Sequence, residues 1–261
     1  MTHEYTTPER APLDIAFVKR LLDEAGVGPV SVHYSRVTSS TQVEARSLLD
    51  AGVQPPFACL TDEQTVGRGR LDRQWFAPSG TSVLMTIALP RPQVLTTLPL
   101  QFGVAVAEVL REAGADVRLK WPNDIVFAHG PDLRKVGGII AEVHGDAVVV
   151  GIGINSTMDD AELPTPEATS LSLEGVSAER ERIIVGVLSR LHEVPALPLD
   201  AYRRLCDTIG RDVRVQQVNG NVVEGRATGV DDDGALLVVS AGRPVRVTSG
   251  DVSRLRGSVG P

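Results

Sequence analysis

The chain contains little cysteine, no excess of basic residues and no long hydrophobic run. Cys59 and Cys206 are the only cysteines among 261 residues, which excludes a disulfide framework and a zinc-ligand pattern and predicts a reducing, cytoplasmic environment. A net charge of −7 argues against nonspecific nucleic-acid binding, because neutralising phosphates requires a basic surface. Apolar runs such as residues 147–154 are far too short to cross a bilayer, and residues 1–15 lack the apolar segment of a secretory signal. We therefore expect neither a nucleic-acid nor a membrane partner.

The remaining composition is that of a folded globular protein. Hydrophobic residues make up 42% of the chain, and its length allows one large domain or a large domain with a small one. Apolar spacing and turn residues predict helices near 14–25, 41–51, 102–113, 179–193 and 199–208, and strands near 30–37, 57–60, 82–88, 117–120, 125–127, 136–143 and 147–155. Thr41 and Glu44 have the spacing of a capping box. Strands joined by tight turns indicate an α+β fold, with a mixed or antiparallel sheet and helices on one side.

The residue pattern of the sequence changes after Gly210. Short valine-rich segments are separated by the turn signals Asn219-Gly220 and Asp231-Asp232-Asp233-Gly234. Four or five short strands in so small a region indicate a β-barrel. We therefore predict a large domain over residues 1–210 and a small C-terminal barrel over residues 211–261. The aspartate run lacks the spacing of a calcium loop, so we interpret it as a solvated turn.

A segment that alternates glycine with arginine is the most informative local pattern. Gly67-Arg68-Gly69-Arg70 is followed by Arg73 and Trp75. Glycine lets the backbone approach a ligand closely, and the arginine guanidinium is a planar set of donors suited to phosphate or carboxylate. In an acidic protein, such a loop favours a site for a small anionic ligand. Two further motifs follow, Lys120-Trp121-Pro122-Asn123-Asp124 and Arg134-Lys135-Val136-Gly137-Gly138-Ile139.

Taken in order, these motifs resemble those of biotin protein ligases. The resemblance is strong over residues 35–155 and rests on Gln64, Gly67–Arg70, Arg73–Phe76, Lys120–Asp124, Lys135–Ile139 and Gly151–Asn155. It implies the biotin/lipoate ligase fold, which is class II synthetase-like, with an SH3-like C-terminal β-barrel. It also implies that biotin and MgATP give biotinyl-5′-AMP, from which biotin passes to a lysine of a biotin carboxyl carrier domain of acyl-CoA carboxylases. Neither step needs an enzyme nucleophile, so catalysis falls to positioning and charge stabilisation.

The resemblance also assigns site residues, position by position. The residues expected to bind biotin are Ser40, Thr41, Gln64, Arg68, Gly69, Arg70, Lys135, Gly138 and Ile139. The residues expected to bind the nucleotide are Arg70, Arg73, Trp75, Asn123, Asp124, Lys135 and Asn155. Lys135, Arg70 and Arg68 are the expected catalytic residues, and Trp75 is expected to stack on adenine. The resemblance names no metal ligands, although Mg²⁺ is expected with ATP.

Plainer interpretations of several of these residues stay open. The arginines and the lysine also suit solvated surface charges. A helix N-cap suits Ser40 and Thr41, a turn suits Asn123-Asp124, core packing suits Trp121, and close packing within a sheet suits Gly151 and Gly153.

Two other functions share part of the pattern. A lipoate ligase or lipoyl transferase shares the fold and the lysine, whereas the Gly-Arg loop and Gly138-Ile139 favour biotin. A noncatalytic biotin or nucleotide sensor needs an output module, and the sequence shows none. Bifunctional family members carry an N-terminal DNA-binding domain, but only 38 residues precede Ser39, so we expect a monofunctional ligase. The residues do not predict the oligomeric state.

Overall fold

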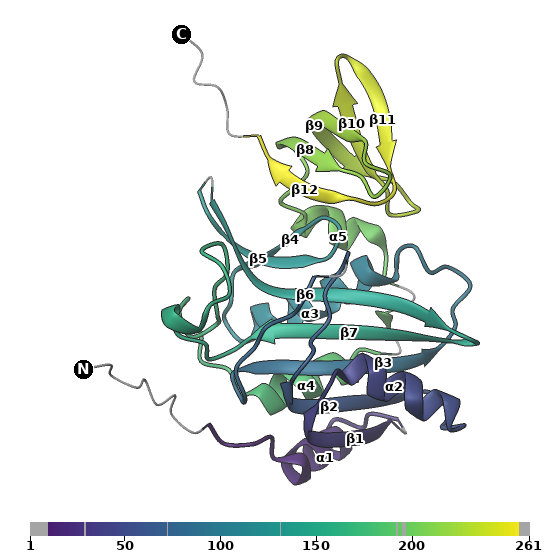
Figure 1. The fold of residues 1–261 in the computed structure, drawn as a ribbon, viewed down its shortest axis with the longest axis vertical. Helices are drawn as coiled ribbons and strands as arrows, with labels where there is room; N and C mark the ends of the chain where they lie inside the picture. Colours follow the sequence, from purple (N-terminus) through teal and green to yellow (C-terminus); the bar gives the residue numbers. More distant parts are fainter. Residues whose placement is uncertain are drawn as a thin grey trace.

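A seven-stranded mixed sheet dominates the computed structural model, which describes residues 10–28, 30–71, 73–130, 132–191, 193–194 and 197–255 (Figure 1). Its strand order is β1-β2-β3-β7-β6-β5-β4. The strands are β1 (Ser31–Thr38), β2 (Phe57–Gln64), β3 (Ser82–Pro90), β4 (Val117–Lys120), β5 (Asp124–His129), β6 (Asp132–His144) and β7 (Ala147–Asn155). β1 runs parallel to β2, and every other neighbouring pair in this sheet is antiparallel. The predicted mixed sheet is therefore confirmed.

The middle of this sheet is covered on both faces. Every residue of β7 is buried, and so are the first eight residues of β3. A strand that is buried on both faces has a continuous apolar run rather than an alternating one. This explains why both strands could be predicted from composition alone.

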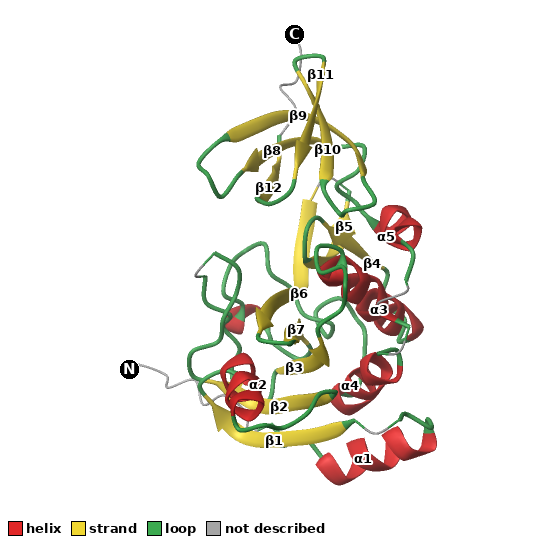
Figure 2. Ribbon diagram, turned by 90° about the vertical axis from the view of Figure 1, so that its right-hand side faces the viewer, coloured by secondary structure: helices red, strands yellow, loops and turns green. Residues whose placement is uncertain are grey.

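Helices cover both faces of the sheet, whereas the sequence predicted helices on one side. The helices are α1 (Ile15–Glu24), α2 (Thr41–Asp50), α3 (Leu98–Glu112), α4 (Arg180–Ser189) and α5 (Leu199–Leu205), with a short 3₁₀ helix at Asp160–Glu162. α1, α3 and α4 lie on one face and α2 lies on the other (Figure 2). The alternation within β2 shows why: Phe57 and Cys59 pack in the small cluster beside α2, and Ala58 and Leu60 pack in the main core. All four residues are apolar, so the sequence did not separate the two faces.

The helix ends follow local chemistry, with one exception. The Asp14 carboxylate accepts a hydrogen bond of 2.9 Å from the first turn of α1, and Gly26 ends this helix with a φ of 63°. The exception is the capping box predicted at Thr41 and Glu44, which is wrong. The N-cap of α2 is Ser40, its side chain makes no capping bond, and Glu44 accepts a hydrogen bond from β1 instead. The hydroxyl of Thr41 faces the cavity described below.

A buried ion pair fastens α4 to the sheet. Arg180 lies 2.8 Å from Asp62, and their side chains are 9% and 3% exposed. Asp62 also accepts hydrogen bonds from the hydroxyl of Tyr34 and the backbone N–H of Leu13. Arg180 donates a second bond, of 2.7 Å, to the carbonyl of Ala11. Ala11 and Leu13, which precede α1, are thereby tied to the core.

The C-terminal residues form a second, five-stranded antiparallel sheet with the order β11-β10-β9-β8-β12. Its strands are β8 (Asp212–Gln216), β9 (Val222–Val230), β10 (Leu236–Ser240), β11 (Arg243–Val247) and β12 (Asp251–Arg254). Asn219-Gly220 lies in the turn between β8 and β9. Asp231 accepts backbone hydrogen bonds within the next turn and pairs with Arg246. Both predicted turns and the small C-terminal barrel are confirmed.

The two sheets share one hydrophobic core. Trp121 lies at their junction, where it is 2% exposed and its indole N–H donates to the carbonyl of Gly234 at 2.9 Å. Arg203 of α5 donates to the carbonyl of Val230 at 2.7 Å. The packing interpretation of Trp121 is therefore confirmed.

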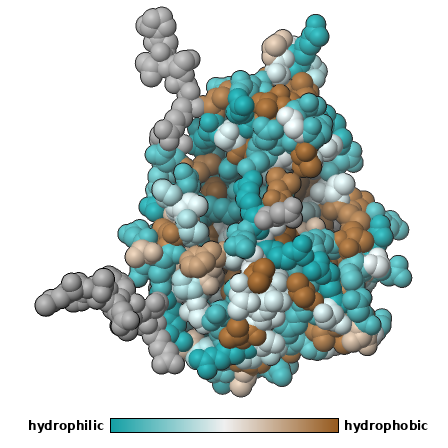
Figure 3. Space-filling model, viewed as in Figure 1, coloured by the Kyte–Doolittle hydropathy of each residue, from teal (hydrophilic) through white to brown (hydrophobic). Residues whose placement is uncertain are grey.

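The surface is a mixture of polar and apolar residues. In the view of Figure 3, hydrophilic side chains cover most of the face, and hydrophobic ones are scattered among them. Within the described part of the chain, no helix combines the length and the apolar character needed to span a membrane.

Candidate active site

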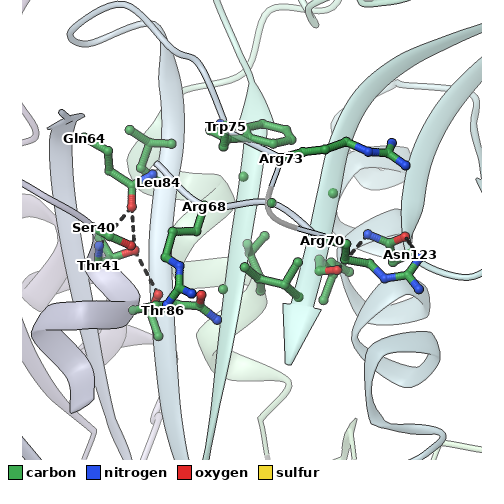
Figure 4. Close-up of a pocket in the computed structure, with 18 of the residues that line it drawn as sticks. Ser40, Thr41, Gln64, Arg68, Arg70, Arg73, Trp75, Leu84, Thr86 and Asn123 are labelled. Atoms are coloured by element: carbon green, nitrogen blue, oxygen red, sulfur yellow. Dashed lines mark hydrogen bonds between the residues drawn. The ribbon is translucent and has the colours of Figure 1, made fainter. Parts of the chain in front are cut away.

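A cavity of about 110 Å³ lies between the large sheet and the Gly67–Trp75 loop (Figure 4). Its walls come from the first turn of α2, from strands of the sheet, from the loop and from Asp251 at the start of β12. Thirteen of the predicted site residues line it, namely Ser40, Thr41, Gln64, Arg68, Gly69, Arg70, Arg73, Trp75, Asn123, Asp124, Lys135, Gly138 and Ile139. The fold thus brings together motifs that lie far apart in the sequence.

Neutral polar groups form a hydrogen-bonded cluster at one end of the cavity. Gln64 Oε1 accepts hydrogen bonds from the backbone N–H of Thr41 at 2.9 Å and from its hydroxyl at 3.1 Å. Thr86 Oγ1 donates in turn to Thr41 Oγ1 at 2.8 Å. Ser40 lies beside them and is 2% exposed. These groups fix one another, so together they form a rigid set of neutral donors and acceptors.

The other end of the cavity is charged. Lys135 Nζ lies 2.6 Å from Asp124 Oδ1, and Lys120 Nζ lies 3.9 Å from Asp124 Oδ2. The side chain of Lys135 is 37% exposed, so its ammonium group stays open to a ligand. Asp124 therefore orients this ammonium group at the border of the cavity.

Arg70 is held by neutral oxygens near the same end (Figure 4). It donates to Asn123 Oδ1 at 3.1 Å and to the carbonyl of Gly250 at 3.3 Å. Asn123 Nδ2 donates to the carbonyl of Ile139 at 2.9 Å, which fixes the amide. Burial lowers the pKa of Arg70, and nearby carboxylates oppose this effect. A guanidinium stays protonated at neutral pH, so Arg70 is a partly buried cation that could bind an anionic ligand.

The other two arginines of the loop are held from different sides. Arg68 lies 3.9 Å from the carboxylate of Glu142 on β6, which Arg46 also binds at 2.8 Å. Arg73 pairs with Asp251 of the C-terminal sheet. The loop is therefore attached to both sheets.

Trp75 packs against two glycines of the large sheet. A Cβ atom on Gly153 would lie 2.5 Å from the indole ring, and one on Gly138 would lie 3.3 Å from it. The Nζ atom of Lys135 is 5.6 Å from the centre of the ring. The close-packing interpretation of Gly153 is confirmed, and the stacking of adenine on Trp75 stays a prediction.

Asn155 lies apart from the other predicted residues. Its Nδ2 donates to the carbonyl of Thr169 at 2.9 Å, and its buried Oδ1 has no hydrogen-bond partner in the described part of the chain. It lines a second cavity, of about 420 Å³, that borders the first. The residues shared by the two cavities include Arg73, Trp75, Asp124 and Lys135. Asn155 therefore lines only the second cavity, and it is connected to the other predicted residues through the residues that both cavities share.

Similarity to known proteins agrees with the site. Residues 34–159 match the biotin/lipoate A/B protein ligase family, and residues 208–255 match the biotin protein ligase C-terminal domain. The biotin–[acetyl-CoA-carboxylase] ligase of Mycobacterium tuberculosis is 35% identical over 95% of this chain and 97% of its own length. The chain belongs to the biotin protein ligase family.

Other members of the biotin protein ligase family are similar over most of the chain. The bifunctional ligase/repressor BirA of Escherichia coli (strain K12) is 31% identical over 91% of this chain and 77% of its own length. The structure of the biotin protein ligase from Aquifex aeolicus in complex with biotin and ATP has a TM-score of 0.74 and 26% identity. The similarity covers 87% of this chain and 99% of that one.

Ten residues that line this cavity were not among the predicted site residues, and they include the polar residues Gln42, Thr86 and Asp251. Thr86 carried a signal, because it is a hydroxyl within an apolar strand. Gln42 carried a weaker one, since it follows Thr41 directly. Asp251 carried none, because its position depends on how the second sheet packs against the first.

Proposed function

We propose that the chain is an ATP-dependent biotin protein ligase. It forms biotinyl-5′-AMP from biotin and ATP, and it transfers biotin to a lysine of the biotin carboxyl carrier domain of acyl-CoA carboxylases. The observation that carries the proposal is the polarity of the cavity. A neutral hydrogen-bonding end around Thr41 and a cationic end around Lys135 suit a ligand with a neutral polar head and a carboxylate tail.

The first half-reaction joins the biotin carboxylate to ATP. A carboxylate oxygen forms a bond to the α-phosphorus, and the bond to pyrophosphate breaks. The two reactants repel each other, and negative charge grows on the α-phosphate. In this proposal the ammonium of Lys135 and the guanidinium groups of Arg70 and Arg68 reduce that repulsion, and the burial of Arg70 strengthens its effect. Asp124 orients Lys135.

The second half-reaction needs an amine and no enzyme nucleophile. The neutral amine of the acceptor lysine attacks the acyl carbon of the mixed anhydride, a C–N bond forms, and AMP leaves with the bonding electron pair. The nitrogen then loses a proton to solvent. The chain contributes mainly by holding the anhydride and by excluding water from the buried part of the cavity.

The remaining assignments divide between the two ends of the site. We assign Ser40, Thr41, Gln64, Gly69, Gly138 and Ile139 to the biotin head and tail, and Arg73, Trp75, Asn123, Asp124 and Asn155 to the nucleotide. The second cavity supports this division, because it extends from Lys135 and Trp75 to Asn155 and is large enough for part of a nucleotide.

Mg²⁺ enters this proposal with ATP, as part of the substrate. The described residues contain no group of three or more histidine, cysteine, aspartate or glutamate side chains placed to hold a metal ion. Mg²⁺ in nucleotide sites takes many of its ligands from phosphates and water, so few protein ligands are needed. The buried Oδ1 of Asn155 is an oxygen of suitable chemistry beside this cavity.

We also propose two domains, over residues 1–210 and 211–261, and a cytoplasmic location. The boundary falls in the segment between α5, which ends at Leu205, and β8, which begins at Asp212. The buried thiols of Cys59 and Cys206 suit a reducing compartment.

The test is biotin transfer by the purified chain. With ATP, Mg²⁺, labelled biotin and a carrier domain, we expect biotin-dependent release of pyrophosphate and label on one lysine of the carrier. Adenylate formation with lipoate but not with biotin would show a lipoate ligase instead. Biotin binding without release of pyrophosphate would show a sensor.

A further inference from the structure

Lys135 lies at a point where strand β6 changes its neighbour. The pairing of β6 with β7 begins at Gly137, so it does not reach Lys135. The register of β5 against β6 also shifts between Ile125 and Val126, which marks a β-bulge. A bulge re-aims side chains and interrupts the regular pairing of a strand. On the side of β7, the backbone of Lys135 therefore has to find a different partner.

Residues 167–169 are that partner. The backbone N–H of Lys135 donates to the carbonyl of Glu167 at 2.6 Å, and the N–H of Thr169 donates to the carbonyl of Lys135 at 2.9 Å. Ala168 forms an isolated parallel bridge with Lys135. This short segment belongs to the connection between β7 and α4, so on this side Lys135 depends on a loop rather than on a full strand.

Thr169 also holds a second residue of the site. It is completely buried, and its carbonyl accepts a hydrogen bond of 2.9 Å from Nδ2 of Asn155. A carbonyl can only accept, so Asn155 turns its Nδ2 toward Thr169 and leaves its Oδ1 free beside the second cavity. One buried residue is thus bonded to both Lys135 and Asn155.

Glu174 anchors this threonine from outside the two cavities. The hydroxyl of Thr169 donates to Glu174 Oε1 at 2.7 Å, and His129 Nε2 lies 2.8 Å from Glu174 Oε2. The side chain of Glu174 is only 9% exposed, and it lines neither cavity. A hydrogen bond to a carboxylate is stronger than one between neutral groups. The carboxylate is therefore a firm anchor for a segment that belongs to no strand.

We propose that Thr169 and Glu174 are positioning residues for the formation of the adenylate. This inference rests on the function proposed above. The hydrogen bond between them fixes residues 167–169, and these residues fix the backbone of Lys135. Lys135 in turn carries the charge that reduces the repulsion between the two reactants. A shift of about 1 Å caused by a distant mutation can lower a rate on the order of 10²-fold, so this indirect contact matters for the rate.

The decisive variant is Thr169→Val, which removes the hydroxyl and keeps the shape of the side chain. Single-turnover formation of biotinyl-5′-AMP at saturating ATP should fall by about 10- to 100-fold. Thr169→Ser keeps the hydroxyl and should retain most of the rate. Thr97→Val is the matched control: Thr97 is a buried threonine before α3, its hydroxyl donates to Gln101 at 3.3 Å, and it lines neither cavity. This control should keep the wild-type rate.

A double-mutant cycle with Lys135→Gln tests whether Thr169 acts through Lys135. In the Lys135→Gln background, Thr169→Val should slow the reaction by less than about threefold, because the group that it positions is already absent. A merely structural role predicts instead that the two losses multiply.

A second pair of variants separates the rate from stability. Thr169→Val leaves the carboxylate of Glu174 without this donor, so the variant should melt at a lower temperature. The double variant Thr169→Val/Glu174→Met removes both partners and should melt closer to the wild type. Its rate of adenylate formation should nevertheless stay low, because the anchor is still absent.

Three results would overturn the inference: a wild-type rate in Thr169→Val, a loss that multiplies with that of Lys135→Gln, or a Thr169→Val/Glu174→Met variant that recovers both its stability and its rate. A wild-type chain that neither binds biotin nor releases pyrophosphate would overturn the proposed function itself. The two failures are distinguishable, because the first is measured against an active wild type.

Discussion

Replacing Lys135 with glutamine should separate catalysis from folding. The substitution roughly keeps the length of the side chain and removes one positive charge, 2.6 Å from Asp124 and 5.6 Å from the centre of the Trp75 ring. Lys135 lies on β6, which pairs with β5 and β7, so its backbone is fixed before any ligand arrives. We expect adenylate formation to fall by about 10²- to 10³-fold, as when one preorganised stabilising group is lost.

The stability of the chain should change little in comparison. The pair formed by Lys135 and Asp124 is partly exposed, and such pairs contribute about 0–1 kcal/mol. Lys120 lies 3.9 Å from the same carboxylate, so Asp124 keeps a cationic neighbour in the variant. A thermal melt should therefore place the variant close to the wild type.

Single-turnover synthesis of biotinyl-5′-AMP measures the chemical step directly. Lys120→Gln is the comparison variant, because it removes an equal charge that lies farther from the same carboxylate, and it should slow this step less. Near-normal synthesis by Lys135→Gln, or equal losses in both variants, would refute the assignment of Lys135 and leave it as a solvated charge at the end of a strand.

The remaining predictions concern packing and stability. Gly153→Ala should weaken biotin binding by roughly tenfold, because the new methyl group displaces Trp75; Gly229→Ala, whose nearest neighbour is 3.8 Å away, should leave it unchanged in the same calorimetric titration. Arg180→Met should lower the free energy of unfolding in urea by about 3–5 kcal/mol, since it leaves a buried carboxylate unpaired, and a loss below about 1 kcal/mol would contradict this. Burial and a carboxylate hydrogen bond raise the pKa of Tyr34 to about 12, whereas a tyrosine in the unfolded chain titrates near about 10. The folded state then holds the proton more tightly, so stability should fall as the pH rises from about 10 to about 12, and it should fall less in Tyr34→Phe.

The strands and most helices were predictable because their signals are local. β4 and β7 have the predicted bounds, since a short apolar run between turn residues defines each of them. β6 extends from Asp132 to His144, well beyond the predicted 136–143, because charged residues at the ends of a long strand carry no apolar pattern. The position of α2 on the second face was missed because it depends on distant packing.

The site was predictable to the extent that its residues occur in motifs. Glycines, arginines and the lysine at motif spacing identified most of the cavity lining, whereas Asn155 was assigned to the same site and lies beside it. The hydroxyl of Thr41 was assigned to a capping box and bonds to Gln64 instead. The partner of a hydroxyl depends on which groups the fold brings within hydrogen-bond distance, and the local sequence does not show this. For the same reason, Asp251 and its ion pair with Arg73 had no signal in the sequence.

The two tryptophans of the chain stand at two different places, and this gives the molecule a built-in optical readout. Trp75 forms part of the cavity wall, and Trp121 is buried where the two sheets meet. Fluorescence from Trp75 should respond to ligands, whereas fluorescence from Trp121 should respond to separation of the sheets. Trp75→Phe leaves a chain that reports only the junction, and Trp121→Phe leaves one that reports only the cavity. Occupancy of the site and cohesion of the two halves can thus be followed separately, without attaching any dye.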